Sequence, residues 1–282
     1  ISLTRRIQLQ IPLLSAAMDT VTEAPAAIGM AQAGGLGVIH RNMTPDQQAV
    51  EVARVKKFES GIIMDPICIQ ESARIGEVLQ LVRDKGISGL PVLNSSGRLS
   101  GIVTRRDLRF EPPTELAVTE VMTPRHRLVT ASPAAERSEI ASLLHEYRIE
   151  KVLLVDEDDR LVGLITAKDL HKEVEFPRAS KDERGRLRVA AAIGTGEDTE
   201  ARLEQVLTAG VDAIVVDTAH GHSVSVLDLV TQIKGTHPEV DVIAGNIATG
   251  EAARAMADAG ADVVKVGIGP GSICTTRIVA GV

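Results

Sequence analysis

The stretch Asp241–Gly269, DVIAGNIATGEAARAMADAGADVVKVGIG, contains one complete strand–helix–strand unit. The apolar runs 241–247 and 262–269 are too short for helices and rich in Val and Ile, which indicates buried strands. Residues 250–259 between them carry a helical pattern that ends at Ala259-Gly260, and a glycine just past a helix supplies the left-handed backbone that stops it. Two such strands joined through a helix predict parallel neighbours in one sheet.

The same alternation extends over most of the chain. Ala-Gly pairs also close predicted helices at 33–34 and 209–210. Six strands that alternate with helices predict an α/β domain with a parallel sheet, either open or closed into a barrel. The other predicted strands are 11–19, 36–40, 188–194 and 212–219, and the other predicted helices are 23–33, 45–58, 198–209 and 223–235.

The amino-acid composition excludes several classes of protein. Apolar residues make up 44% of the 282 residues and aromatic residues only 1%, so the core must consist of Val, Ile, Leu and Ala. A net charge of −7 and the scarcity of aromatic rings argue against nucleic acid as the main partner. No apolar run approaches the length of a membrane span, and the first residues lack the layout of a signal peptide. Two distant cysteines do not form a disulfide scaffold, so we expect a reducing, cytoplasmic location.

An internal repeat interrupts the alternation. Residues 86–108, GISGLPVLNSSGRLSGIVTRRDL, align with 148–170, RIEKVLLVDEDDRLVGLITAKDL, at a constant offset of 62 residues. The offset predicts two copies of one α+β unit, 61–116 and 117–176, inserted into a discontinuous domain formed by 1–60 and 177–282.

Cys274 lies at the end of a glycine-rich loop that follows the last predicted strand. Its thiolate could be stabilised by loop amides and act as a nucleophile, or the side chain could be a small buried hydrophobe. Gly267, Gly269 and Gly271 could bring backbone groups close to a phosphate or a cation. Asp217 could bind a ribose or cap the next helix, whereas His220 and His222 lack further ligands at metal spacing.

Five segments resemble the inosine-5′-monophosphate (IMP) dehydrogenase family: LLSAAMDTVTE (13–23), GGLGVIHRNM (34–43), DAIVVDTAHGHS (212–223), VIAGNIAT (242–249) and, most specifically, VVKVGIGPGSICTTRIVAGV (263–282). The last segment is also similar to guanosine monophosphate (GMP) reductase. The inserted repeat resembles the tandem cystathionine-β-synthase (CBS) domains of many of these dehydrogenases. The resemblance implies a (β/α)₈ barrel of which about six strands are present. We therefore expect this sequence to be part of a longer protein and to be inactive by itself.

The resemblance assigns roles to individual residues. It implies that Cys274 attacks C2 of IMP, that a hydride passes to NAD⁺, and that Thr276 helps to position the water that releases xanthosine monophosphate. It also implies a potassium ion on the carbonyls of Gly269, Gly271 and Cys274. The substrate would lie against Ala16, Met18, Asn246 and Ser272, and NAD⁺ against Asp217, Thr218, Ala219, Gly267 and Gly269.

In the inserted pair, the resemblance implies binding of nucleotides such as ATP or GTP. The residues expected at these sites are Thr104, Asp107, Thr166, Lys168 and Asp169. The alternative for these Thr and Asp residues is helix capping, because Thr and Asp favour the first turn of a helix. A homotetramer or an octamer is also implied. GMP reductase, and a nucleotide-sensing protein with an inactive barrel remnant, are the competing functions.

Overall fold

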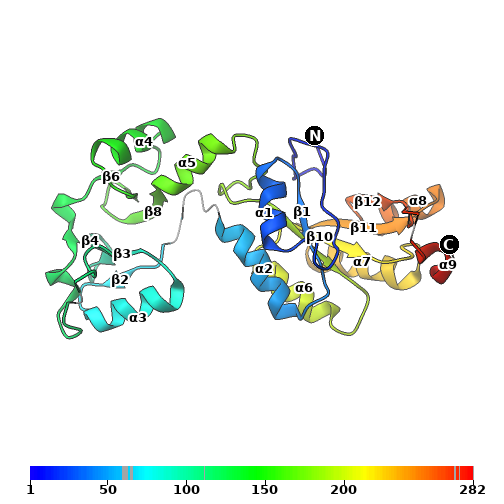
Figure 1. Ribbon diagram of the computed structural model, residues 1–282, viewed down its shortest axis with the longest axis horizontal. Helices are drawn as coiled ribbons and strands as arrows, with labels where there is room; N and C mark the ends of the chain where they lie inside the picture. Colours follow the sequence, from blue (N-terminus) through cyan, green and yellow to red (C-terminus); the bar gives the residue numbers. More distant parts are fainter. Residues whose placement is uncertain (59–62, 64–65, 111, 270, 273, 282) are drawn as a thin grey trace. The chain divides into compact units, whose positions relative to one another are not determined.

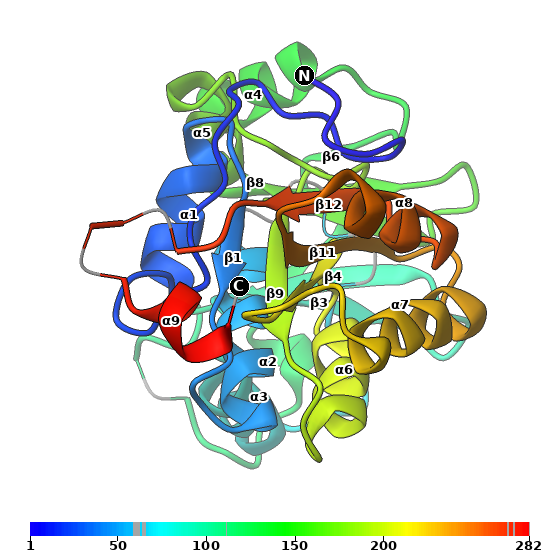
Figure 2. The same ribbon diagram turned by 90° about the vertical axis from the view of Figure 1, so that its right-hand side faces the viewer.

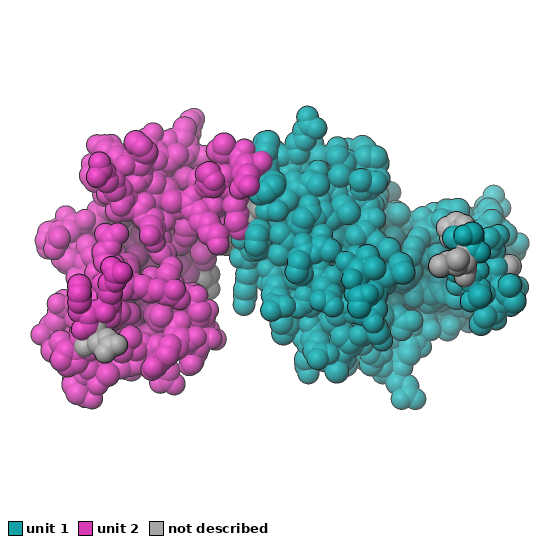
Figure 3. Space-filling model, viewed as in Figure 1, with its two compact units in different colours: residues 1–60, 176–282 teal, residues 61–175 magenta. Residues whose placement is uncertain are grey.

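The computed structural model describes residues 1–58, 63, 66–110, 112–269, 271–272 and 274–281. The chain divides into two compact units (Figure 3). Unit 1 comprises Ile1–Ser60 and Phe176–Val282, and unit 2 comprises Gly61–Glu175. Each unit has hydrophobic clusters of its own. The predicted boundary between residues 60 and 61 lies outside the described residues.

Unit 1 contains a five-stranded parallel sheet whose strands follow their order along the chain (Figure 1). The alternation thus correctly predicted an α/β domain with a parallel sheet. A doubly wound sheet reverses its strand order at a switch point, and this sheet shows no reversal within the described residues. The neighbours in order are β1 (Gly37–Ile39), β9 (Val189–Ile193), β10 (Ala213–Asp217), β11 (Asp241–Ile247) and β12 (Val263–Val266).

The predicted strand at 11–19 is wrong in extent. Only Leu14 pairs, in a single parallel bridge to Leu36. The next ladder position fails because the Val38 N–H donates to the Ser15 hydroxyl at 2.9 Å instead of to a backbone carbonyl. The chain then turns at Met18, whose carbonyl accepts two backbone hydrogen bonds. A serine side chain therefore ends the pairing, and the sheet formed by the described residues of unit 1 has five strands instead of the six predicted.

Helices connect the strands of unit 1 and pack against one another in pairs. α1 packs on α2, α2 on α6, and α7 on α8. Figure 2 shows α7 and α8 at the right of the view. None of the described helices is long and apolar enough to span a membrane. The helices are α1 (Ala24–Gln32), α2 (Pro45–Phe58), α6 (Thr199–Thr208), α7 (Val224–Thr236), α8 (Gly250–Asp258) and α9 (Thr276–Ala280).

Both faces of the sheet are buried, as β9 illustrates. All five of its residues are buried. Val189, Ala191 and Ile193 join the cluster that includes the helices, whereas Ala190 and Ala192 join a second cluster on the other face. Ile7 and Leu9 from the N-terminal segment belong to that second cluster. Continuous Val, Ile and Ala runs are the composition expected of such a sheet.

A buried lysine connects the chain before unit 2 to the chain after it. Lys56 Nζ lies 3.0 Å from Asp182 Oδ2 and 2.8 Å from Asp212 Oδ2, and the three side chains are 3%, 5% and 8% exposed. Burial alone would raise the pKa of Asp182, but Lys56 and hydrogen bonds from Arg186 outweigh it and hold that pKa below its ordinary value. Burial dominates at Asp212 and raises its pKa.

In unit 2, the hairpins of the two copies of the sequence repeat have the same strand pairing. The hairpin Gly89–Thr104 pairs in the same register as Lys151–Thr166, residue for residue at an offset of 62, including the irregularity near the turn. Each copy has a short strand and a helix before its hairpin. The first copy has β2 (Ile69–Gln70), α3 (Ile75–Lys85), β3 (Gly89–Leu93) and β4 (Leu99–Thr104), and the second has β6 (Thr130–Ala131), α4 (Arg137–Glu146), β7 (Lys151–Val155), β8 (Leu161–Thr166) and then α5 (Ala167–Glu175).

The two copies exchange their leading segments. β5 (Thr123–Pro124) lies at the start of the second copy, between the short 3₁₀ helices Val118–Glu120 and Arg125–Arg127. It nevertheless pairs with β4 of the first copy. Conversely, Ile63 lies at the start of the first copy but pairs with Leu164 in β8 of the second. Arg98 bridges to Arg160, its own counterpart at the offset of 62, as expected near a two-fold axis. Leu99, Ile102, Leu153 and Leu164 form a core shared by both copies.

Candidate active site

Several polar residues and a glycine of unit 1 lie at or just after the carboxyl ends of its parallel strands. His40 comes directly after β1, Asp217 ends β10, Asn246 lies near the end of β11, and Gly267 follows β12. Because the strands are parallel, these ends meet along one edge of the sheet, where α/β proteins bind their ligands.

The Cys274 thiol lies against the glycine loop. A Cβ atom on Gly269, whose φ is +47°, would come within 2.7 Å of Cys274 Sγ, so this position has room for glycine alone. The thiol lies 3.1 Å from the Thr276 hydroxyl, and the Cys274 N–H donates to the Gly271 carbonyl at 3.0 Å. Hydrogen bonding from Thr276 lowers the pKa of Cys274, and the Arg277 charge acts in the same direction. The loop therefore holds a thiol with enhanced thiolate character.

Asn246 connects the end of β11 to the start of this loop. Its Nδ2 donates to the Gly267 carbonyl at 2.6 Å, and the Gly267 N–H donates to the Ile247 carbonyl at 2.9 Å. Its Oδ1 is buried and has no hydrogen-bond partner among the described residues. A buried amide oxygen without a donor indicates a place where a ligand can supply one.

Asp217, at the end of β10, is held by a lysine of β12, which lies two strands away across β11. Lys265 Nζ lies 2.6 Å from Asp217 Oδ1, and both side chains are partly exposed. Thr218 continues the backbone pairing, because it donates to the Gly245 carbonyl and accepts from the Asn246 N–H, each at 3.0 Å. Its hydroxyl also donates to the Gly245 carbonyl, at 2.8 Å. Asp217 is thus an oriented carboxylate, whereas the Thr218 hydroxyl already has a structural partner.

The remaining predicted contacts of unit 1 lie on the surface. Met18 is 58% exposed, and Ala16, Ala219 and Ser272 are exposed as well. The Ala16 carbonyl accepts from the Thr22 hydroxyl at 2.6 Å and from the Met18 N–H at 2.8 Å, which fixes the turn on which Met18 stands. These side chains are accessible to a ligand.

In unit 2, Thr and Asp bond to each other in both copies. The Thr104 hydroxyl donates to Asp107 Oδ2 at 2.7 Å, and the Thr166 hydroxyl donates to the Asp169 carboxylate. Capping is compatible with Thr166, because the Asp169 N–H donates to its hydroxyl at 3.3 Å in the first turn of α5. Helix capping is wrong for Thr104, because residues 105–110 form turns.

A cavity of about 570 Å³ adjoins the first of these pairs. Burial lowers the pKa of Lys151 in its wall. Neither Thr166, Lys168 nor Asp169 is among the residues around it, so the two copies differ in what surrounds their Thr-Asp pairs. The side chains that line it include Thr104, Arg105, Arg106, Asp107, Arg127 and Lys151.

The family model for the IMP dehydrogenase / GMP reductase domain matches residues 1–282. The chain belongs to this family. It is 57% identical to inosine-5′-monophosphate dehydrogenase of Rhizobium tropici and 53% identical to that of Aquifex aeolicus, matches that cover 98% and 99% of this chain. These matches cover 55% and 57% of the relatives, so the chain spans somewhat more than half of their length.

Solved structures of the same family match the fold. A crystal structure of GMP reductase from Trypanosoma brucei in complex with guanosine 5′-triphosphate has a TM-score of 0.82 and 38% sequence identity. The match covers 99% of this chain and 68% of that chain. The family recognised from five sequence segments is confirmed.

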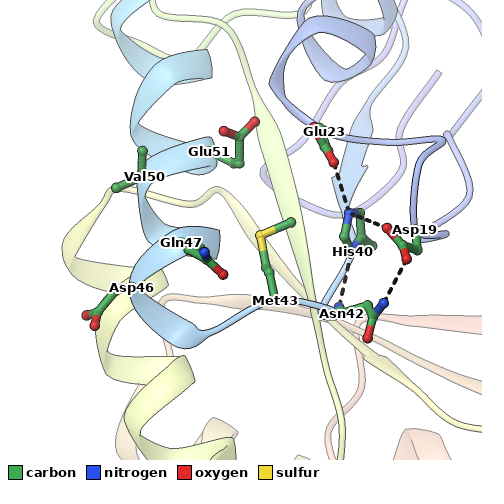
Figure 4. Close-up of a pocket in the computed structure, with 9 residues that line it drawn as sticks. All are labelled: Asp19, Glu23, His40, Asn42, Met43, Asp46, Gln47, Val50 and Glu51. Carbon is green, nitrogen blue, oxygen red and sulfur yellow. Dashed lines mark hydrogen bonds and ion pairs between the residues drawn. The ribbon is translucent and has the colours of Figure 1, made fainter.

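The sequence analysis did not predict one cluster of ionisable side chains in unit 1. Asp19, Glu23 and His40 approach one another at the same edge of the sheet, with one ligand atom each inside 4.8 Å of the others (Figure 4). Asp19 ends the strand predicted at 11–19 and His40 follows β1, which was the available indication, but nothing in the spacing relates Glu23 to them. The Lys265–Asp217 pair was also not predicted.

Proposed function

We propose that the protein containing this chain oxidises IMP to xanthosine monophosphate with NAD⁺, in guanine nucleotide synthesis. The position of Cys274 carries the proposal, because its thiol combines a lowered pKa with a glycine loop at the ligand-binding edge of the sheet. Identity of 49–57% to proteins named IMP dehydrogenase, against 37–38% to the structures named GMP reductase, favours the dehydrogenase.

The chemistry assigned to the chain is covalent catalysis. Cys274 Sγ attacks C2 of the base, and the C2 hydrogen departs with its electron pair. NAD⁺, when bound, accepts that hydride. Water then attacks C2 and breaks the C–S bond, which yields xanthosine monophosphate, a proton and the free thiol. Thr276, whose hydroxyl lies 3.1 Å from Sγ, would stabilise the thiolate and orient this water. Two easier steps thereby replace one difficult displacement.

Binding roles follow from the positions of the side chains. We assign the unpaired Asn246 Oδ1 to the nucleotide, together with the exposed Ala16, Met18 and Ser272. Asp217, oriented by Lys265, is suited to accept hydrogen bonds from the ribose of NAD⁺. The neighbouring Thr218, Ala219, Gly267 and Gly269 would contribute mainly backbone groups to the same ligand.

The glycine loop also fits a monovalent cation. Gly269, Gly271 and Cys274 offer carbonyl oxygens, which suit a large, weakly hydrated ion such as K⁺ better than Mg²⁺ with its strict octahedral geometry. The Gly271 carbonyl already accepts the Cys274 N–H, and an oxygen with two lone pairs can serve both partners. A cation there would stabilise the loop that holds the thiol.

Unit 2 is proposed to be a pair of CBS domains, 61–116 and 117–176, that bind ATP- or GTP-type nucleotides. The cavity beside Thr104 and Asp107 supports this role, since its arginines and Lys151 suit phosphates. Thr166, Lys168 and Asp169 are proposed as the second site. The sequential strand order supports a (β/α)₈ barrel completed by further chain, and the family resemblance supports a cytoplasmic homotetramer or octamer.

The replacement Cys274→Ala tests the main proposal. In the protein that contains this chain, it should abolish NADH formation from IMP while nucleotide affinity stays within about tenfold, equal to ~1.4 kcal/mol. Intact-mass spectra with IMP and NAD⁺ should show an adduct on the parent protein alone. Turnover at the parental rate in the alanine variant would end the nucleophile assignment. Consumption of NADPH with GMP, without oxidation of IMP, would instead identify the reductase.

A further inference from the structure

Unit 1 has a cavity of about 430 Å³ beside the proposed active-site residues, and the mechanism uses none of its lining (Figure 4). The turn after Met18, the end of β1 and the first turns of α2 surround it. No lysine or arginine is among its lining residues, whereas four carboxylates are. The lining consists of Asp19, Glu23, His40, Asn42, Met43, Asp46, Gln47, Val50 and Glu51.

His40 is the buried polar group of this cavity. The residue is 2% exposed, and its Nε2 has no hydrogen-bond partner among the described residues. Asp19 Oδ1 and Glu23 Oε1 each lie 3.6 Å from Nε2, which is beyond a hydrogen bond. A buried donor or acceptor left unpaired costs free energy, so the arrangement leaves a place for a third group between the ring and the carboxylates.

The other ring nitrogen determines what that group can be. His40 Nδ1 accepts the Asn42 backbone N–H at 3.1 Å, so the neutral ring carries its proton on Nε2. A histidine that binds a metal through Nε2 needs a lone pair there and a proton on Nδ1, which it normally donates to an oxygen. Here Nδ1 faces a donor. The three side chains are therefore close enough for a metal ion, but His40 has the wrong tautomer for one.

A hydroxyl group satisfies His40 and one of the two carboxylates. Its oxygen can accept the Nε2–H of His40, and its proton can be donated to a carboxylate. Two neighbouring hydroxyls can donate one hydrogen bond each, one to Asp19 Oδ1 and the other to Glu23 Oε1. The Asp19 carboxylate is already oriented to accept such a bond through Oδ1, because its Oδ2 accepts a hydrogen bond from Asn42 Nδ2 at 2.7 Å.

The rest of the lining selects the remainder of the ligand. Asp19, Glu23 and Asp46 repel phosphates and carboxylic acids. The fourth carboxylate, Glu51, is paired with Arg54 at 2.6 Å. Met43 and Val50 offer apolar surface to a ring. We propose that this cavity binds the ribose diol of a nucleoside through Asp19, Glu23 and His40. A free nucleoside and the ribose of a dinucleotide share this chemistry. The inference does not depend on oxidation of IMP.

The test compares adenosine with 2′,3′-dideoxyadenosine, which keeps the base and lacks both hydroxyls. Long-range ¹H–¹⁵N spectra of the histidine rings report on His40 itself, assigned with a His40→Asn variant, so binding elsewhere on the chain does not interfere. We expect the Nε2–H tautomer in the free protein, a shift of the His40 signals with adenosine, and none with the dideoxy compound. A response to NAD⁺ as well would extend the site to dinucleotides, and its absence would restrict the site to free nucleosides.

Variants test whether the side chains proposed to bind the diol are the ones that determine the adenosine response. Asp19→Asn and Glu23→Gln should each weaken the adenosine response about tenfold, since each loses a charged acceptor. Asp46 lines the same cavity but lies away from His40. The variant Asp46→Asn is therefore the matched control, and we expect it to leave the adenosine response of His40 unchanged. Three results would each overturn the proposal. Equal shifts of the His40 signals with both nucleosides would show that the hydroxyls are not recognised, and selective broadening of those signals by Mn²⁺ would indicate a metal site. No response to either nucleoside would mean that the cavity holds only water.

Discussion

Lys56 offers a direct test of how unit 1 is held together. In Lys56→Met, the buried Asp182 and Asp212 lose their shared ammonium, and removal of one partner from a buried ion pair costs about 3–5 kcal/mol. Both carboxylates keep other partners, since Asp182 accepts from Arg186 Nε at 2.9 Å and Asp212 from the Val189 N–H at 2.8 Å. We therefore expect the lower end of that range, a loss of about 3 kcal/mol in the free energy of unfolding at pH 7.

Urea denaturation followed by circular dichroism measures this loss. Lys57→Met is the matched control, because the neighbouring side chain is exposed and should change the free energy of unfolding by less than about 0.5 kcal/mol. Adding Asp182→Asn and Asp212→Asn to Lys56→Met should recover part of the loss, since no buried charge is then left without its cation. A loss below about 1 kcal/mol in the single variant would refute the reasoning.

The same variant has a predicted pH dependence. In the parent chain, the lowered pKa of Asp182 stabilises the fold at neutral pH, and this contribution is lost as the pH falls through its folded value. The raised pKa of Asp212 acts in the opposite sense, because stability is lost as the pH rises through its folded value. Without Lys56 both values rise, so the deficit of the variant should shrink on acidification. A deficit that grows in acid would contradict this assignment.

Three further outcomes are expected. Thr276→Val removes the main cause of the lowered Cys274 pKa, so the pH profile of iodoacetamide alkylation should move to higher pH, and an unchanged profile would exclude that cause. Asp107→Ala should weaken nucleotide binding to unit 2 by ~1–3 kcal/mol in calorimetry, whereas undiminished heats would restrict Asp107 to its bond with Thr104. In the protein that contains this chain, IMP oxidation should rise with K⁺ and not with Li⁺, and equal rates would argue against a cation on the loop carbonyls.

Local patterns were sufficient to predict most elements. Residues 45–58 were predicted as a helix and form α2 over the same bounds, because Thr44-Pro45 marks its start. The predicted helix 250–259 corresponds to α8, Gly250–Asp258, which Thr249 caps by accepting from the Ala252 N–H. The offset of 62 residues is repeated in the register of both hairpins of unit 2. Turn residues and periodicity carry this information within a few positions of the chain.

Contacts between distant residues could not be predicted in this way. The partners of Lys56 lie 126 and 156 residues away, and a lysine in the last turn of a helix gives no indication that it is buried. The strand predicted at 11–19 failed because one hydroxyl, that of Ser15, took the place of a carbonyl. The tautomer of His40 depends on a single backbone N–H, which no spacing of residue types encodes.

The exchanged leading segments make the second copy in unit 2 the attachment point for both of its chain connections. The incoming chain pairs at Ile63 with Leu164 in β8, and the outgoing helix α5 starts at Ala167, directly after the same strand. From Ile63 the chain continues toward β2 of the first copy. A pull applied through the two connections would thus load β8 first and leave the first copy unstrained. The core that Leu99, Ile102, Leu153 and Leu164 share offers one route by which a nucleotide beside Thr104 could act on β8 and α5.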